Sequence, residues 1–286
     1  CPSPQIISNN IKLTAPTVVG VMTTLAGGGT DSTSTGISSI LSKLKSPQGV
    51  FVDKNGNTYI SDSRGHKVRK VSPNGIITTI AGTGVAGATG TGGLATAARI
   101  NYPLGIYVDT IGNVYISCLY ENRIRKVSAS TGIISTFAGN GTYGNIGDGG
   151  LATSARIGSV QSITGDTTGN IYFTDFDFGS VRKVNAAGII TRVAGLGTGT
   201  MGYSGDGGLA TAAELGAPNG VCFDGLGNMY ISDDVPNCVR KVNPSGIIST
   251  VAGGSNSIGD SGDGGLATSA LFGDIESMVA DSIGNL

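Results

Sequence analysis

The residue types that most often perform acid, base or metal chemistry are sparse in this sequence. One histidine, His66, stands among 286 residues, and the repeated pattern described below holds Asn122, Gly179 and Asn237 at its place. We therefore interpret His66 as a solvated turn residue rather than a base. A two-histidine metal site is excluded, and a nucleophile, histidine and acid arrangement is not favoured. The sequence thus predicts no catalytic residue and no metal site.

An arginine–lysine pair is the most regular charged feature of the chain. Its copies are Arg69-Lys70, Arg125-Lys126, Arg182-Lys183 and Arg240-Lys241. Because successive residues of a strand point to opposite faces, each copy presents one cation on a fixed face. These cations form either a ring that binds an anion or structural bridges to carboxylates such as Asp62, Asp175 and Asp233. The near balance of 18 basic and 19 acidic residues favours the bridges.

Glycine-rich segments resemble two kinds of ligand-binding loop. The spacing G-x-G-x-x-G, typical of a dinucleotide-binding turn, occurs at 82–87, 139–144 and 197–202. No long amphipathic helix pattern follows these copies, and a cofactor motif would not recur in every repeat, so we interpret them as loops. Each Gly-Asp-Gly-Gly segment offers one carboxylate, whereas a calcium loop clusters several oxygen ligands. We therefore expect no cofactor.

The elements that must position these residues follow from an internal repeat. The dipeptide Gly-Asn recurs at Asn57, Asn113, Asn170, Asn228 and Asn285, with a period of 56 to 58 residues. The first unit carries the β-branched segments GVFVD, TYISD, KVRKV and IITTIAG, separated by turn signals such as KNGN and SPNG. This order predicts an all-β fold of four-stranded antiparallel meanders, the blades of a β-propeller. The full units span 49–82, 105–139, 162–195 and 220–253.

Two short motifs separate the strands. Gly-Asn lies at the first hairpin of each unit, where positive φ is needed, and an aspartate four residues earlier, such as Asp53, folds onto the turn amides. The segment GDGGLATSA lies between the fourth strand of one unit and the first strand of the next. We expect Asp148, Asp206 and Asp263 to cap a short helical turn there, and the Leu and Ala side chains to fill the gap between neighbouring blades.

The two ends of the sequence carry complementary parts of one further unit. Residues 10–27 align with a third and a fourth strand, and residues 275–286 align with a first strand and its turn. We predict one propeller over 10–286 after an extension at 1–9, with five blades, or six if the chain continues, closed by strands from both ends. The missing second strand is residues 4–8, a continuation of the chain, or a segment of a neighbouring molecule. The residues expected to take part in closure or assembly are Ile6, Ile7, Ile11, Leu13, Met278 and Val279.

The four cysteines form no C-x-x-C pair and cannot make a zinc site with one histidine. Cys222 is expected in a first strand and Cys238 in the third strand of the same unit. Two strand spacings are about 9 to 10 Å, beyond the limit of about 7 Å for a disulfide, so we expect no bond between these two residues.

The pattern PxGVxxDxxGNxYIxDxxxxxVRKVxxxGIITTxAG, followed by GDGGLATSA, resembles the long NHL repeat of secreted and surface proteins. The resemblance covers nearly the whole chain from about Asn10 and implies a β-propeller. It implies no single function, because the fold hosts scaffolds, ligand binders and some enzymes. The chain departs from the pattern at Cys118, where other units have aspartate, and at 160–165, where Pro-x-Gly is lost.

Composition limits the partners and the compartment. Charged residues make up 13% of the chain and the net charge is -1, so we expect no nucleic-acid partner. No apolar run reaches the length of a membrane span. The sequon Asn140-Gly141-Thr142 and the low Lys and Glu content favour an extracellular or cell-surface location, with Asn140 as a glycosylation site. A lipid-modified Cys1 is a minor alternative.

The sequence therefore favours a non-enzymatic extracellular propeller that acts as a scaffold or a self-assembling, filament-forming subunit. Its partner is then another protein, foremost another copy of the chain. The alternative is a surface propeller that binds a carbohydrate or a protein through aromatic side chains, for which the residues are Tyr143, Tyr203, Phe176 and Phe178. A metal-dependent hydrolase or lyase is least favoured.

Overall fold

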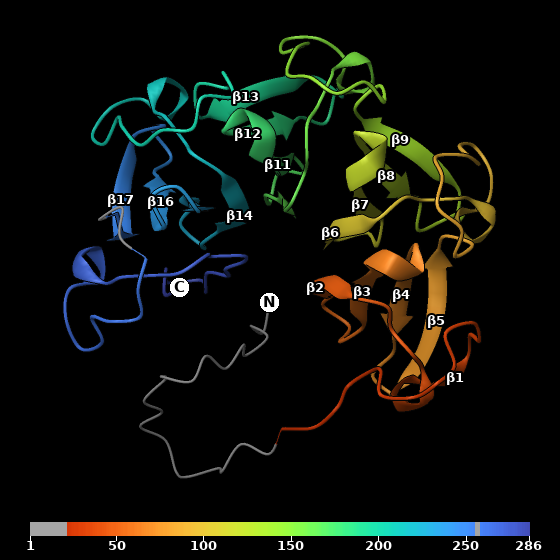
Figure 1. Ribbon diagram of the computed structural model, residues 1–286. Coiled ribbons are helices and arrows are strands. Elements are labelled where there is room, and N and C mark those ends of the chain that lie inside the picture. Colours follow the sequence, from red (N-terminus) through yellow and green to blue (C-terminus); the bar gives the residue numbers. More distant parts are fainter. Residues whose placement is uncertain (1–21, 255–257) are drawn as a thin grey trace.

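The computed structural model describes residues 22–254 and 258–286, and the described chain is all-β. Four antiparallel sheets follow one another in an open arc, with the chain passing from one sheet to the next (Figure 1). In sheets 2 to 4 the spatial order of the strands is their order in the sequence. Sheet 1 has the order β1-β5-β4-β3-β2, because a segment of the preceding connector adds a short outer strand.

The strands coincide with the predicted repeat. Sheet 1 contains β1 (Ile37–Ser38), β2 (Pro47–Val52), β3 (Thr58–Asp62), β4 (Lys67–Val71) and β5 (Ile76–Ala81). Sheet 2 contains β6 (Pro103–Val108), β7 (Val114–Cys118), β8 (Arg123–Val127) and β9 (Ile134–Ala138). Sheet 3 contains β10 (Ile163–Gly165), β11 (Ile171–Asp175), β12 (Ser180–Val184) and β13 (Ile190–Ala194). Sheet 4 contains β14 (Pro218–Phe223), β15 (Met229–Asp233), β16 (Cys238–Val242) and β17 (Ile248–Gly253). The prediction of a four-stranded antiparallel meander in each full unit is confirmed.

Short 3-10 turns lie at one end of the sheets. One set joins the second strand to the third, and comprises η2 (Ser63–Gly65), η4 (Leu119–Glu121) and η6 (Phe176–Phe178). The other set lies in the connectors, and comprises η1 (Ser39–Leu41), η3 (Ala95–Ala97), η5 (Ala152–Ser154), η7 (Ala210–Ala212) and η8 (Ala267–Ser269). We call the end of the sheets that carries both sets the connector face.

The first hairpin of each sheet closes as the sequence predicts. In sheet 1, Oδ1 of Asp53 accepts hydrogen bonds from the amides of Asn55 and Asn57, both at 2.9 Å. The side-chain amide of Asn57 donates to Oδ2 of Asp53 at 2.8 Å. Burial opposes ionisation of Asp53, but the bonds from Asn57 and Asn55 lower its pKa. The turn aspartate is therefore held as a carboxylate.

The connectors differ from the prediction in two respects. The connector turns η3, η5, η7 and η8 each begin after a leucine such as Leu151, and no side chain caps them, so the expected aspartate caps are wrong. Leu151 is also 57% exposed, whereas Ala152 and Ala155 are buried. The alanines and the following Ile157 fill the gap between sheets, where they belong to one buried cluster. The leucine lies on the rim beside Ile189.

Each sheet has two apolar faces, and in the interior of the arc neighbouring sheets cover both. One face of sheet 2, with Ile106 and Val108, packs against Tyr59 of sheet 1. Its other face, with Tyr115, packs against Phe173 of sheet 3. The same pattern joins sheets 3 and 4. The core is therefore a series of sheet-to-sheet layers rather than one central cluster.

Residues 275–286 contain no strand, yet they occupy the place of a fifth unit beside sheet 4. Ile275, Met278 and Ala280 pack on the last face of that sheet. Asp281 and Asn285 form the same turn as the other units, with the amide of Asp281 donating to the Asn285 carbonyl at 2.9 Å. The predicted turn is present, and the predicted first strand is not hydrogen-bonded into a sheet.

The other end of the arc shows the matching half of this pattern. The amide of Gly27 donates to the carbonyl of Ser39 at 3.0 Å, as Gly82 does to Ala95 at 2.9 Å after the fourth strand of sheet 1. Residue 27 therefore lies where the fourth strand of a preceding unit ends. Residues 10–21, the rest of the expected third and fourth strands, lie outside the described residues.

The first strands approach one another so closely that glycine is required. A Cβ added to Gly105 on β6 would lie 2.7 Å from the carbonyl oxygen of Gln161 in the next unit. We expect Gly105→Ala to lower the free energy of unfolding by about 1–3 kcal/mol, because the two strands must separate. Urea unfolding checks this value. Gly273→Ala is the control, since its Cβ meets no atom within 4 Å, and an equal loss in both variants would contradict the assignment.

Candidate functional site

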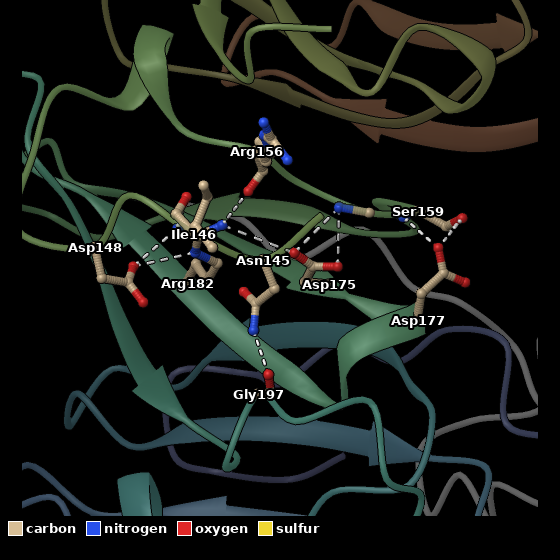
Figure 2. Close-up of polar contacts among 10 residues, drawn as sticks. Asn145, Ile146, Asp148, Arg156, Ser159, Asp175, Asp177, Arg182 and Gly197 are labelled. Carbon is tan, nitrogen blue, oxygen red and sulfur yellow. Dashed lines mark hydrogen bonds and ion pairs between the residues drawn. The ribbon is translucent and has the colours of Figure 1, made fainter. Parts of the chain in front are cut away.

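The most elaborate polar structure of the chain surrounds a buried arginine on the connector face (Figure 2). In sheet 3, the Arg182 side chain is fully buried and its Nη2 donates to Oδ1 of Asp148 at 2.9 Å. Its Nη1 donates to the carbonyl of Arg156 at 2.8 Å. Oδ2 of Asp175 lies 3.9 Å from Nη1 and accepts a bond from the amide of Gly158 at 3.3 Å. One arginine thus joins the third strand of a sheet to the connector that enters it.

The same arrangement recurs in the other sheets with different connector residues. In sheet 4, Nη2 of Arg240 donates to Oδ1 of Asp206 at 2.7 Å. In sheet 2 the connector supplies Thr91, whose Oγ1 accepts from Nη2 of Arg125 at 2.7 Å. In sheet 1, Arg69 donates to the carbonyl of Ser34 at 2.8 Å. Every sheet therefore uses its arginine to hold the incoming connector.

Strand irregularity directs the arginines inward. In each sheet the pairing of the third and fourth strands shifts register immediately before the arginine, as between Val181 and Arg182. Such a bulge re-aims the side chain that follows it. In sheets 1, 2 and 4 the adjacent lysine lies instead over a tyrosine ring, as Lys126 does over Tyr115 at 5.3 Å from the ring centre.

The arginines are thus structural bridges, which the sequence favoured over an anion-binding ring. The expected partners were only partly right. Asp175 contacts its arginine at 3.9 Å, whereas the short bonds come from Asp148 and Asp206 in the connectors. The available signal was the occurrence of GDGG one connector ahead of Arg182 and Arg240. The prediction paired each arginine with an aspartate of its own unit, and it therefore missed the bond to an aspartate in the preceding connector.

Sheet 2 replaces the aspartate of the pattern by a residue from another position. Cys118 stands where sheet 3 has Asp175, and the Glu121 carboxylate takes over its bonds. Oε1 of Glu121 accepts from the amide of Asn101 at 2.8 Å, and Oε2 from Nη1 of Arg125 at 2.8 Å. Glu121 and Arg125 are both buried. Glu121, three residues after Cys118, therefore supplies the carboxylate that sheet 2 lacks at Cys118.

Burial sets the ionisation of the strand-end aspartates. It raises the pKa of Asp175 to about 7 and that of Asp233 to about 6, against hydrogen bonds from backbone amides and the nearby arginines, which lower them. In these two sheets the connector carboxylates Asp148 and Asp206 lie closer to the arginine charge. The buried aspartate therefore holds a proton more readily, and the connector carboxylate makes the short bond to the arginine.

His66 belongs to the turn, as predicted, but it is bonded rather than simply solvated. It adopts a left-handed conformation with φ 49° at the end of η2. Its Nδ1 accepts a hydrogen bond from the amide of Tyr102 at 3.2 Å. This ring links sheet 1 to the connector of sheet 2, which is a structural role.

The four aromatic residues named from the sequence fall into two environments. The Tyr203 hydroxyl pairs with Thr250 Oγ1 at 2.7 Å, and its ring lies 4.9 Å from the Arg240 guanidinium carbon, so Tyr203 completes the sheet 4 network. Tyr143 is 56% exposed and its ring centre lies 5.2 Å from that of Phe178. Phe176 lies in the same η6 turn as Phe178. Of these four residues, only Tyr143 and Phe178 form an accessible aromatic pair.

The remaining predicted residues are widely separated. Asn140 is exposed, its Oδ1 accepts from the amide of Thr142 at 2.8 Å and its side-chain nitrogen donates to Ser154 at 3.1 Å. Met278 packs on sheet 4, and Val279 is 41% exposed. The other residues expected to take part in assembly, Ile6, Ile7, Ile11 and Leu13, lie outside the described residues.

Cysteines and glycine motifs have structural positions. Cys222 on β14 and Cys238 on β16 are free thiols with β15 between them, as their predicted strands require. The segments 82–87, 139–144 and 197–202 lead from a fourth strand into a connector. Within 22–254 and 258–286 no group of three or more His, Cys, Asp or Glu residues is arranged to hold a metal ion. No helix in the same part of the chain is long and apolar enough to cross a membrane.

Part of the sequence is similar to curated proteins. Teneurin-1 of Gallus gallus is 27% identical over 215 residues, which covers 66% of this chain and 8% of that protein. No protein-family model matches the chain. This chain thus spans less than a tenth of the length of that relative.

Solved structures show the fold. An auxiliary nutrient binding protein of Bacteroides thetaiotaomicron superposes with a TM-score of 0.62 at 16% identity, over 86% of this chain and 56% of that one. A gluconolactonase of Xanthomonas campestris gives 0.54 at 17% identity, over 84% and 68%. A chain of a nidogen/laminin complex gives 0.52 at 18% identity, over 73% and 65%. These neighbours are β-propellers of the NHL and SMP-30 kind, so the four sheets are arranged as in a propeller.

The substitution in sheet 2 provides a rescue test. We expect Glu121→Gly to lower the free energy of unfolding by about 3–5 kcal/mol, because Arg125 is left buried without its carboxylate. Adding Cys118→Asp recreates the residues of sheet 1, Asp62 and Gly65, and should recover at least half of the loss. Urea unfolding measures both, with Tyr120→Gly, at a 66% exposed position in the same turn, as control. A double variant no more stable than Glu121→Gly would contradict the compensation.

The buried aspartates predict a dependence of stability on pH. The pKa of Asp175 is raised from 3.8 to about 7 by burial, so between those values the folded protein keeps a proton that the unfolded chain releases. Stability should therefore fall as pH rises through this window, by up to about 1.4 kcal/mol per pH unit for one proton. We expect Asp175→Asn to flatten the slope measured by urea unfolding between pH 5 and 7. An unchanged slope would show that the proton is held elsewhere.

Proposed function

We propose that this chain is a non-enzymatic extracellular propeller with long NHL-type repeats, which serves as a scaffold and assembles with further copies through an incomplete fifth blade. The observation that carries the proposal is a difference in exposure between equivalent first-strand residues at the end of the arc and inside it. Val50 of sheet 1 is 62% exposed, whereas its equivalents Ile106, Ile163 and Val221 are 4 to 5% exposed. Among the described residues, Ala26 and Leu44 pack on the part of this face formed by Ile60 and its neighbours. The part around Val50, which a preceding blade would cover, is left exposed by them.

The opposite end of the arc presents the other half of the same contact. Residues 275–286 already lie on sheet 4 where a first strand belongs, and Val279 points away from that sheet's cluster with 41% of its surface exposed. Exposed apolar faces of this kind are usual where another chain docks. We infer that strands expected within residues 10–27 and from a neighbouring copy complete this blade, and that Ile6, Ile7, Ile11 and Leu13 take part.

The location and partner follow from the same proposal. The likeness to Teneurin-1 and to a chain of a nidogen/laminin complex supports an extracellular protein partner. Asn140 lies exposed in a loop, which makes this residue accessible to glycosylation. Intact mass of the chain from a secreting host, compared with Asn140→Gln, tests that site.

Assembly is tested on the full chain by light scattering after size exclusion and by electron microscopy. We expect species larger than one chain at high concentration. Val279→Asp and the pair Ile11→Asp and Leu13→Asp should each reduce them at least tenfold, because a charge cannot enter an apolar layer. Ile111→Asp, at a 76% exposed position in sheet 2, is the matched control. A chain that stays monomeric at millimolar concentration would contradict the proposal.

A second candidate is ligand binding at Tyr143 and Phe178. Ser159 donates two hydrogen bonds to Asp177 next to this pair, at 2.7 and 2.9 Å, and an exposed aromatic platform beside a carboxylate suits a sugar ring. Binding to a panel of soluble polysaccharides, lost in Tyr143→Ala, would favour this function. Lactone hydrolysis, suggested by the gluconolactonase neighbour, would contradict a non-enzymatic role.

A further inference from the structure

The two ends of the arc carry opposite charge, although the whole chain is close to neutral. Residues 22–70 contain seven basic and three acidic side chains, and residues 242–286 contain five acidic and no basic side chain. Sheet 1 and the segment that follows sheet 4 lie on the two sides of the opening in Figure 1. The net charge of -1 therefore conceals a separation of charge along the arc.

The basic end lies at the start of sheet 1 on the connector face. Lys43, Lys45 and Arg64 are all exposed. The Arg64 amide donates to the carbonyl of Lys45 at 3.0 Å, so the turn η2 and the connector hold these side chains beside one another. The open apolar residues Val50 and Val52 follow on the adjoining strand β2 and are 62% and 38% exposed.

The acidic end lies at the corresponding position of the fifth unit. Asp274 and Glu276 are exposed and stand immediately before and within the segment that replaces a first strand. Oδ1 of Asp234, the residue that follows β15 of sheet 4, accepts a hydrogen bond from the amide of Ile275 at 3.1 Å. Burial raises the pKa of Asp234, and the charges of Asp274 and Glu276 raise it further against the bond from Ile275, which places the three carboxylates within electrostatic reach.

The apolar residues at this end complement those of sheet 1. Val279 is 41% exposed and corresponds in the repeat to Phe51 and Tyr107. In the interior of the arc, Phe51 of sheet 1 packs on Tyr107 of sheet 2, with ring centres 5.3 Å apart. The acidic end therefore presents the side of a first strand that faces the next unit, and sheet 1 presents the side that faces the preceding unit.

We propose that the acidic end of one copy docks on the basic end of the next copy, in a head-to-tail contact. This inference rests on the proposed assembly and names its two surfaces. Because the surfaces are different, the contact is heterologous and repeats from copy to copy into an open filament or a closed ring. Opposite charge steers the two ends together and opposes head-to-head pairing, while the apolar residues supply the buried contact.

Charge reversal at each end tests this contact in the full chain. One variant carries Lys43→Glu and Arg64→Glu, and the other carries Asp274→Lys and Glu276→Lys. All four positions are exposed, so circular dichroism should show unchanged folding. Arg99→Glu with Arg156→Glu, on exposed connectors in the middle of the arc, is the control with the same change of charge. Self-association is followed by sedimentation velocity at low and at high salt.

We expect each reversed variant alone to associate at least tenfold more weakly than the wild type, and an equimolar mixture of the two to recover most of the loss. The control should behave as the wild type. If the mixture does not recover and a chain carrying all four substitutions does, the charged ends meet within one molecule, and the inference is overturned. If the wild type associates and neither variant weakens it, assembly stands and this contact is wrong. If the wild type never associates, the proposed assembly itself fails.

Discussion

Each sheet of this chain is apolar on both faces, and the rest of the structure follows from the need to cover both. Sheet 2 shows the requirement, because Ile106 and Val108 pack toward sheet 1 while Tyr115 packs toward sheet 3. A layer of this kind gains little from folding alone, since each core is shared with a neighbour. The arc is the result, and at its two ends the described residues cover the outer face only in part.

The connectors fix how one layer lies on the next. A buried arginine is costly unless its hydrogen bonds and charge are matched, and here the matching groups come from the connector that enters the sheet. Arg182 with Asp148 and Arg240 with Asp206 show this with carboxylates, and Arg125 with Thr91 shows it with a hydroxyl. Sheet 2 then needs its own carboxylate, and Glu121 supplies it. The charge of the arginine is balanced locally in each of these three sheets, by whichever element has the acid.

Regular and irregular units therefore have different significance. The features that recur, such as the Asp-x-x-Gly-Asn turn and the arginine, hold the strands and the layers together. Some features that do not recur are accessible on the connector face, among them Tyr143 with Phe178 and the charged residues at the two ends. The recurring arginines are fully buried and bonded to the connectors, so these exceptions are the polar and aromatic groups that remain accessible for binding.

The sequence by itself determined the strands, the hairpin turns and the layered all-β architecture. Period and alternation are local properties, so Gly56-Asn57 with Asp53 was sufficient to predict its turn. Contacts between units could not be predicted in the same way. Leu151 was expected inside and lies outside, Asp148 was expected to cap a turn and instead bonds Arg182, and Glu121 replaces the aspartate missing at Cys118. Each of these depends on which side chains two separate segments bring together, and only the packing of sheet on sheet decides that.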